Sequence, residues 1–81
     1  MDEVHARKIL RDLLDEEKVL ISEIQNANTK DDRIVALQNY SNKVNKFLMA
    51  LDGQKNNPLF KSVYGEAVRI RNWAAELKGE I

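Results

Sequence analysis

Residues 60–81 read FKSVYGEAVRIRNWAAELKGEI, and this stretch decides the fold class. Apolar residues recur in it at alternating steps of three and four, without a break: Phe60, Val63, Ala67, Ile70, Ala74, Leu77 and Ile81. Because an α-helix has 3.6 residues per turn, this spacing places all of these side chains on one face. The stretch therefore predicts an amphipathic helix whose apolar stripe packs against other helices.

Two earlier stretches repeat the spacing, each with one polar residue near its middle. One ladder holds Ala6, Leu10, Leu13, Glu17, Leu20, Ile24 and Ala27, and the other holds Ile34, Leu37, Ser41, Val44, Leu48 and Leu51. The chain is therefore predicted to be all-α, with helices over residues of about 3–27, 31–52 and 58–78.

The start of the second helix carries a capping signal. Thr29 and Asp32, three positions apart, have the form of a capping box, in which the threonine hydroxyl accepts a hydrogen bond from the first turn. Asp31 is a competing N-cap residue. The second helix is thus expected to begin at about residue 31.

Glycine and proline predict the other boundaries. Gly53 is expected to end the second helix in a left-handed conformation, and Pro58 to open the third at its first helical position. Gly79 is expected to stop the third helix. Gly65 lies inside that helix, where it predicts either a close approach of another segment to the backbone or a tolerated weak position.

Both connections are only a few residues long, which favours antiparallel neighbours. We therefore predict one domain over residues 1–81, an up-down-up antiparallel three-helix bundle. Further apolar residues flank the three stripes and widen them: Ile9, Leu14, Ile21, Tyr40, Phe47, Leu59, Tyr64 and Trp73. A lone bundle of this size would leave some of them exposed, so we predict a homodimer that closes into a larger helical bundle.

Pairing the helices around their turns places Glu17, Ser41 and Arg69 or Arg71 at the same height. These residues form either a buried polar layer, which can fix the register of a bundle, or a set of charges at the solvated rim. Both interpretations stay open from the sequence.

Charge and composition exclude several classes of protein. Lysine plus arginine and aspartate plus glutamate number 13 each, so the net charge is zero and the strong basic field of a nucleic-acid-binding protein is missing. Residues 1–40 carry a net charge of −3 and residues 41–81 a net charge of +3. Cysteine is absent, no apolar run approaches the ~20 residues that cross a bilayer, and the first residues are acidic. These features predict a soluble, cytoplasmic protein.

Catalytic residue sets are missing from the sequence. His5 is the only histidine, and it lies near the N-terminus. The glycines are isolated, and the Glu-x-x-His spacing of di-iron bundles does not occur. We therefore expect no enzymatic activity, no metal and no cofactor.

Two groups of residues are candidates for binding. The first comprises the aromatic residues Tyr64, Trp73, Phe47 and Tyr40, which we predict to contact a protein partner. The second comprises Lys43, Lys46, Arg69 and Arg71, which could hold an anion at a subunit interface while the aromatic rings stack on a base.

The stretch TKDDRIVALQNY at residues 29–40, together with KGE at residues 78–80, resembles the small YvfG-type proteins of bacilli. The resemblance covers residues 28–80 and leaves most of the first helix as an extension. It implies a helical hairpin that self-associates, and the family has no assigned activity that the resemblance would transfer.

Three functions are compatible with these features. The first is a small non-enzymatic interaction or regulatory protein of bacterial or phage origin that binds a protein partner through an apolar helical face. The alternatives are a phage-type protein that sequesters an anionic nucleotide at a subunit interface, and a bacteriocin-immunity-like bundle.

Overall fold

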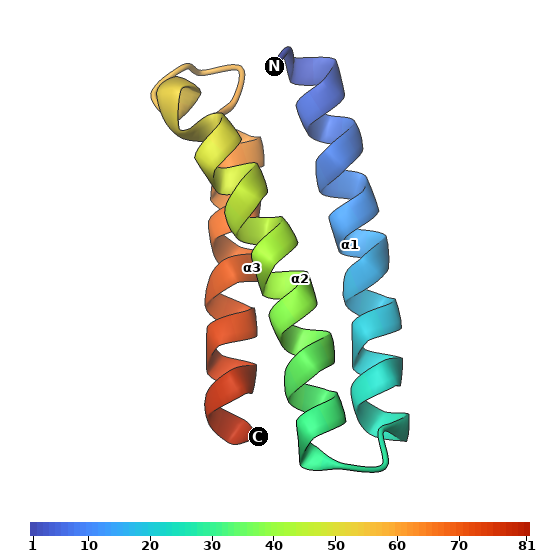
Figure 1. Ribbon diagram of the computed structural model, residues 1–81. Coiled ribbons are helices and arrows are strands. Elements are labelled where there is room, and N and C mark those ends of the chain that lie inside the picture. Colours follow the sequence, from blue (N-terminus) through green and yellow to red (C-terminus); the bar gives the residue numbers. More distant parts are fainter.

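The computed structural model describes residues 1–81 and shows a three-helix bundle without strands. Helix α1 spans Glu3–Asn26, α2 spans Lys30–Leu51, a short 3-10 helix η1 spans Asp52–Gln54, and α3 spans Lys61–Glu80. Figure 1 shows α2 running antiparallel to both α1 and α3. The predicted all-α, up-down-up architecture is confirmed. None of the helices combines the length and the apolar character that a membrane span requires.

Side chains cap the first two helices. The Asp2 carboxylate accepts a hydrogen bond from the backbone N–H of His5 at 2.7 Å, and the Thr29 hydroxyl accepts one from the backbone N–H of Asp32 at 3.1 Å. Each bond satisfies a backbone donor that the helix itself leaves unpaired. Thr29 rather than Asp31 is therefore the N-cap residue of α2.

The predicted helix ends at glycine are wrong. No glycine has a positive φ, so neither Gly53 nor Gly79 forms a left-handed cap. The chain instead tightens into η1, which contains Gly53, because a 3-10 turn also satisfies the last carbonyls of a helix. Gly79 lies inside α3, which continues to Glu80.

The predicted start of α3 at Pro58 is also wrong. The side-chain oxygen of Asn57 accepts a hydrogen bond from the Leu59 N–H at 3.0 Å, and the backbone carbonyl of Asn57 accepts one from the Phe60 N–H at 2.9 Å. These bonds hold residues 57–60 in a separate turn. The helix therefore begins at Lys61, and the first bond that leads into it joins the Tyr64 N–H to the Phe60 carbonyl.

Nothing approaches Gly65 closely. A Cβ atom built on this residue would meet no atom within 4 Å apart from its chain neighbours and the backbone of its own helix. Of the two sequence interpretations, the tolerated weak position is the one that the structure supports.

The core contains 14 buried residues, and all three apolar ladders contribute to it. They are Ala6, Leu13, Leu20, Leu37, Tyr40, Val44, Phe47, Leu48, Leu51, Phe60, Val63, Ala67, Ile70 and Ala74. Helix α1 supplies only three of them over 24 residues, whereas α2 supplies six over 22. Helix α1 is therefore the more lightly packed cover on a denser α2–α3 hairpin.

Candidate protein interface

Two of the four predicted partner-binding residues lie inside the bundle. Tyr40 and Phe47 are each only 4% exposed in the single chain. The Tyr40 hydroxyl donates a hydrogen bond to the Leu13 carbonyl of α1 at 2.7 Å, and its ring meets the Trp73 ring edge to face at 6.3 Å between centroids. Of the flanking residues, some of which we expected to stay exposed in a lone bundle, Tyr40 and Phe47 are covered by α1, whereas Leu59 remains 59% exposed and Ile21 40%.

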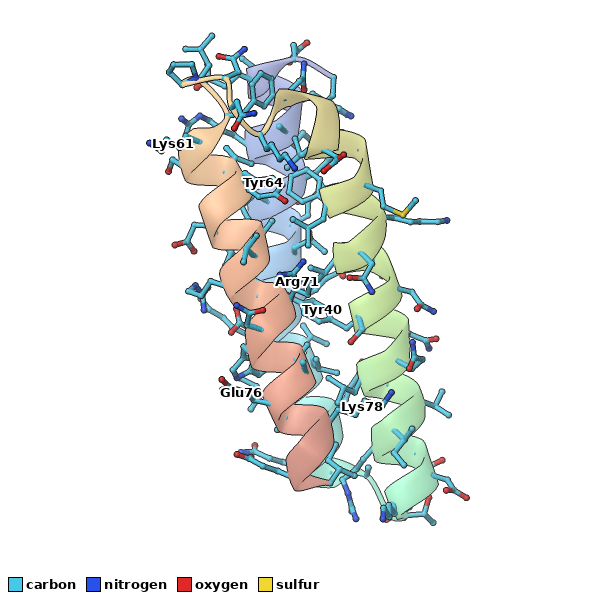
Figure 2. All side chains as sticks on the ribbon, turned by 90° about the vertical axis from the view of Figure 1, so that its left-hand side faces the viewer. Tyr40, Lys61, Tyr64, Arg71, Glu76 and Lys78 are labelled. Carbon is cyan, nitrogen blue, oxygen red and sulfur yellow. The ribbon has the colours of Figure 1, made fainter.

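The other two predicted residues are half-buried and lie on different sides of α3. Trp73 packs on Tyr40, whose hydroxyl bonds α1, whereas Tyr64 is on the side that faces α2. Figure 2 shows Tyr64 between α3 and α2. Of the aromatic set, Tyr64 alone borders an open groove on the α2–α3 side of the bundle.

The environment of Tyr40 favours its protonated form. Burial raises the pKa of the Tyr40 hydroxyl well above its usual range, because an ionised phenol would lose its hydration. The carboxylates of Glu17 and Glu16 add to this increase, and the Arg69 guanidinium opposes it. The hydroxyl therefore remains a hydrogen-bond donor to α1 throughout the neutral range.

The residues of the predicted polar layer do not lie together but occupy two different sides of α3. Glu17 and Arg69 approach to 3.8 Å between α1 and α3, and Arg69 also bonds Glu66 at 3.1 Å. Ser41 and Arg71 line the other side of α3, against α2. No polar or charged residue is buried, so the rim interpretation of the sequence is the one that the structure supports.

The four predicted anion-binding residues lie at three different places on the single chain. Lys43 pairs with Glu16 at 3.3 Å, and it shares the groove between α1 and α2 with Lys46. Arg69 lies between α1 and α3, and Arg71 lies between α2 and α3. Carboxylates pair with Lys43 and Arg69 and line the groove that holds Lys46. One chain therefore does not gather these four cations around a single ligand.

The first open groove, the α1/α2 groove, follows the first two helices. Its upper part has an apolar floor formed by Met1, Ile9, Leu13, Phe47 and Ala50, with charged residues at the rim. Farther along, it is lined by Val19, Leu20, Ala36 and Tyr40. The Glu16–Lys43 ion pair bridges the groove where the two parts meet.

The second, the α2/α3 groove, lies between α2 with the start of η1 and α3. From α2 it is lined by Gln38, Ser41, Val44, Asn45, Leu48 and Met49, from η1 by Asp52, and from α3 by Tyr64, Arg71, Ala74, Ala75 and Lys78. Figure 2 shows Tyr64, Arg71 and Lys78 one below another along α3. No side-chain hydrogen bond or ion pair links α2 to α3, so this groove is unbridged along its length.

Sequence reasoning missed the α2/α3 groove, although a signal for it exists. Tyr64, Val68, Arg71, Ala75 and Lys78 form a second ladder with steps of four and three, beside the apolar ladder of α3. Its two basic residues make it look like an ordinary solvated face. Only the position of α2 shows that the members of this ladder other than Val68 line a groove.

No family model, curated protein or solved structure matches this chain. The resemblance to YvfG-type proteins therefore stays a prediction, as do the nucleotide-sequestering and immunity-like alternatives.

Proposed function

We propose that this chain is a small, non-enzymatic helical binding module of bacterial or phage origin, which works in the cytoplasm and takes a helix of a protein partner into the α2/α3 groove. The observation that carries the proposal is that this groove is the one that no side-chain bond crosses. The Glu16–Lys43 pair crosses the α1/α2 groove, and the Glu17–Arg69 pair links α1 to α3.

The apolar end of the groove supports this choice. Met49 is 77% exposed, which makes it one of the most exposed large apolar side chains of the protein, and it lies beside the half-buried Tyr64 and the floor residue Leu48. Methionine adapts to the shape of a partner, and tyrosine offers a large rigid surface with a polar tip. A helix laid between α2 and α3 would cover all three side chains.

The non-enzymatic part of the proposal is supported by the place of the single histidine. His5 is exposed on the first turn of α1, and its backbone N–H is bonded to the cap residue Asp2. The α2/α3 groove contains no histidine and only one carboxylate, Asp52. A binding role uses what this groove offers, whereas acid–base catalysis would need further groups.

Variants in the groove test the proposal. We expect that proteins captured from the native host by the wild-type chain are lost with Met49→Ser and Tyr64→Ser, because both changes remove apolar contact area. The partner is then purified and its affinity measured directly by calorimetry. The matched control is Val35→Ser, at a 58% exposed valine of α2 that lines neither groove. A purified partner that binds Met49→Ser, Tyr64→Ser and the wild type equally tightly would refute the groove.

Self-association is a separate proposal, and it uses the α1/α2 groove. Tyr40 and Phe47 are already covered by α1, so they do not contribute to a dimer interface. What supports it is the apolar floor at Met1, Ile9 and Ala50, which a second copy would cover. The two proposals use different faces and can both hold.

A further inference from the structure

Two cations in the α2/α3 groove have no anionic partner. Arg71 and Lys78 both line its lower part, and neither lies within 4 Å of a carboxylate. They are seven residues apart on α3, which puts them on the same face and about 10 Å apart along the helix axis. Figure 2 shows both side chains along the α2-facing side of α3, whereas Glu76 lies on its opposite side.

The wall opposite these cations carries no charge. Gln38, Ser41 and Asn45 of α2 are neutral, and the nearest carboxylate of the groove is Asp52 at its upper end. Asp52 already lies 3.6 Å from the ammonium group of Lys55. The lower part of the α2/α3 groove is therefore positive, unlike the two bridged faces, where acids and bases alternate.

The floor between the cations is made of small residues. Ser41, Val44, Ala74 and Ala75 line the stretch from Arg71 to Lys78, and none of them is larger than valine. Small side chains allow the backbone of a docked helix to come close, whereas the larger Leu48, Met49 and Tyr64 at the upper end require apolar side chains opposite them.

From this pattern we propose that the partner helix in the α2/α3 groove is acidic and amphipathic, with two carboxylates seven residues apart that pair with Arg71 and Lys78. Its remaining inward residues are apolar and lie toward Met49 and Tyr64. This inference rests on the proposed function, because it specifies the occupant of the same groove.

The spacing of the cations favours a helix over a small anion. A single phosphate reaches one of two groups that are about 10 Å apart, whereas carboxylates at i and i+7 of a helix match that distance. A second copy fits less well. Its own carboxylates with this spacing, Glu16 and Glu23, border the α1/α2 groove, so such docking would join unlike faces and would not close into a pair.

The test uses the full chain and synthetic helical peptides of about 20 residues, a length that can form helix in isolation. The first peptide carries leucine on one face with glutamates seven residues apart, and the second has glutamine in place of both glutamates. We expect the glutamate peptide to bind more tightly, by anisotropy of a labelled peptide. We also expect Arg71→Gln and Lys78→Gln each to weaken its binding about two- to fivefold at low salt.

Arg11→Gln and Lys18→Gln are the matched controls, because they remove the same charges from exposed positions of α1 that are not in an ion pair. We expect them to leave the affinity unchanged. Chemical-shift changes in the protein amides upon peptide addition should centre on Asn45, Ala75 and Lys78.

Several results would overturn the inference. Equal affinity for the glutamate and glutamine peptides would show that the groove binds a helix whether or not it carries the two carboxylates. That result would leave the proposed function intact. Failure of both peptides to bind would overturn the inference alone, since the proposed function is tested with the natural partner. Displacement of the peptide by inorganic phosphate would point to a plain anion site, and loss of peptide binding as the protein dimerises would point to a second copy as the occupant.

Discussion

Tyr40 joins the three helices at a single side chain. It belongs to α2, its ring packs on Trp73 of α3, and its hydroxyl bonds the Leu13 carbonyl of α1. A carbonyl oxygen has two lone pairs, so Leu13 can accept this bond in addition to the one within its own helix. Because α1 buries few residues, a directed bond to its backbone helps to fix where it lies on the hairpin.

We expect Tyr40→Phe to lower the free energy of unfolding by about 1 kcal/mol at neutral pH, because it removes one buried hydrogen bond and keeps the ring. Urea unfolding followed by circular dichroism measures the change. The control is Tyr64→Phe, whose hydroxyl makes no hydrogen bond within the chain. Unchanged stability of the Tyr40 variant would mean that the bond adds nothing to the folded state.

The stability that Tyr40 contributes should depend on pH. Burial raises its pKa in the folded chain, so at high pH the unfolded chain loses this proton first, near the ordinary tyrosine value of about 10. The contribution is thus complete below about pH 10 and decreases above it, by at most ~1.4 kcal/mol per pH unit. Urea titrations from about pH 9 to 11 should show the wild type approaching Tyr40→Phe in stability. Parallel curves for the two proteins would contradict this assignment.

The roles of single residues were the least predictable from the sequence. Periodicity shows that Tyr40 and Phe47 flank the apolar stripe of α2, but it does not show which side of that stripe α1 covers. Both residues lie on the side that α1 occupies, so residues predicted to contact a partner are core residues. Tyr64, on the opposite side of the hairpin, borders an open groove.

At the scale of the elements, the helices follow from their apolar ladders and their ends do not. The ladder from Phe60 to Ala74 is buried as predicted, because one face of a helix packs as a unit. The ends depend on small differences between local turns. At Asn57 a side-chain bond favours a separate turn over a helix start at Pro58, and the 3-10 helix η1 replaces the predicted glycine cap.

Substitution of two glycines by alanine tests the interior of α3 at Gly65 and the end of α2 at Gly53. We expect Gly65→Ala to raise the free energy of unfolding by about 0.5–1 kcal/mol, because alanine favours helix and its Cβ meets no atom within 4 Å apart from its chain neighbours and the backbone of its own helix. Gly53→Ala should also be neutral or stabilising, because Gly53 has negative φ and open space around it. Urea unfolding measures both. A loss of more than about 1 kcal/mol in Gly53→Ala would indicate the left-handed cap after all.

The N-cap of α2 gives a further test. Thr29→Ala should lower stability by about 1 kcal/mol, because it leaves the Asp32 N–H without its side-chain acceptor. Asp31→Ala is the control, since Asp31 does not cap the helix. If Asp31→Ala were the more damaging change in urea unfolding, the assignment of the cap would be wrong.

At the scale of the whole molecule, three antiparallel helices make an elongated bundle of 42 × 20 × 15 Å whose faces differ in chemistry. The α1 faces are bridged by ion pairs, whereas the α2/α3 groove combines an apolar end with unpaired cations. The sequence could predict the number and direction of the helices. It could not predict the groove, because a groove depends on which two helix faces border the same space.

We expect light scattering at high protein concentration to give a mass of twice the 9.3 kDa of one chain, as the apolar floor of the α1/α2 groove becomes covered. Ala50→Glu should restore the mass of one chain, because it places a charge on that floor. Val35→Glu, outside both grooves, should remain a dimer. A mass of one chain for the wild type at every concentration would refute self-association.

The edge-to-face contact between Tyr40 and Trp73 also gives the protein an optical reporter of its own. Trp73 is the only tryptophan, and its ring centroid lies 6.3 Å from that of Tyr40. At that separation, excitation absorbed by the tyrosine passes to the indole and is emitted there. Detachment of α1 from the hairpin would break the hydrogen bond of Tyr40 and let water reach the ring pair, which would change that emission, so the docking of this lightly packed helix can be followed without any attached dye.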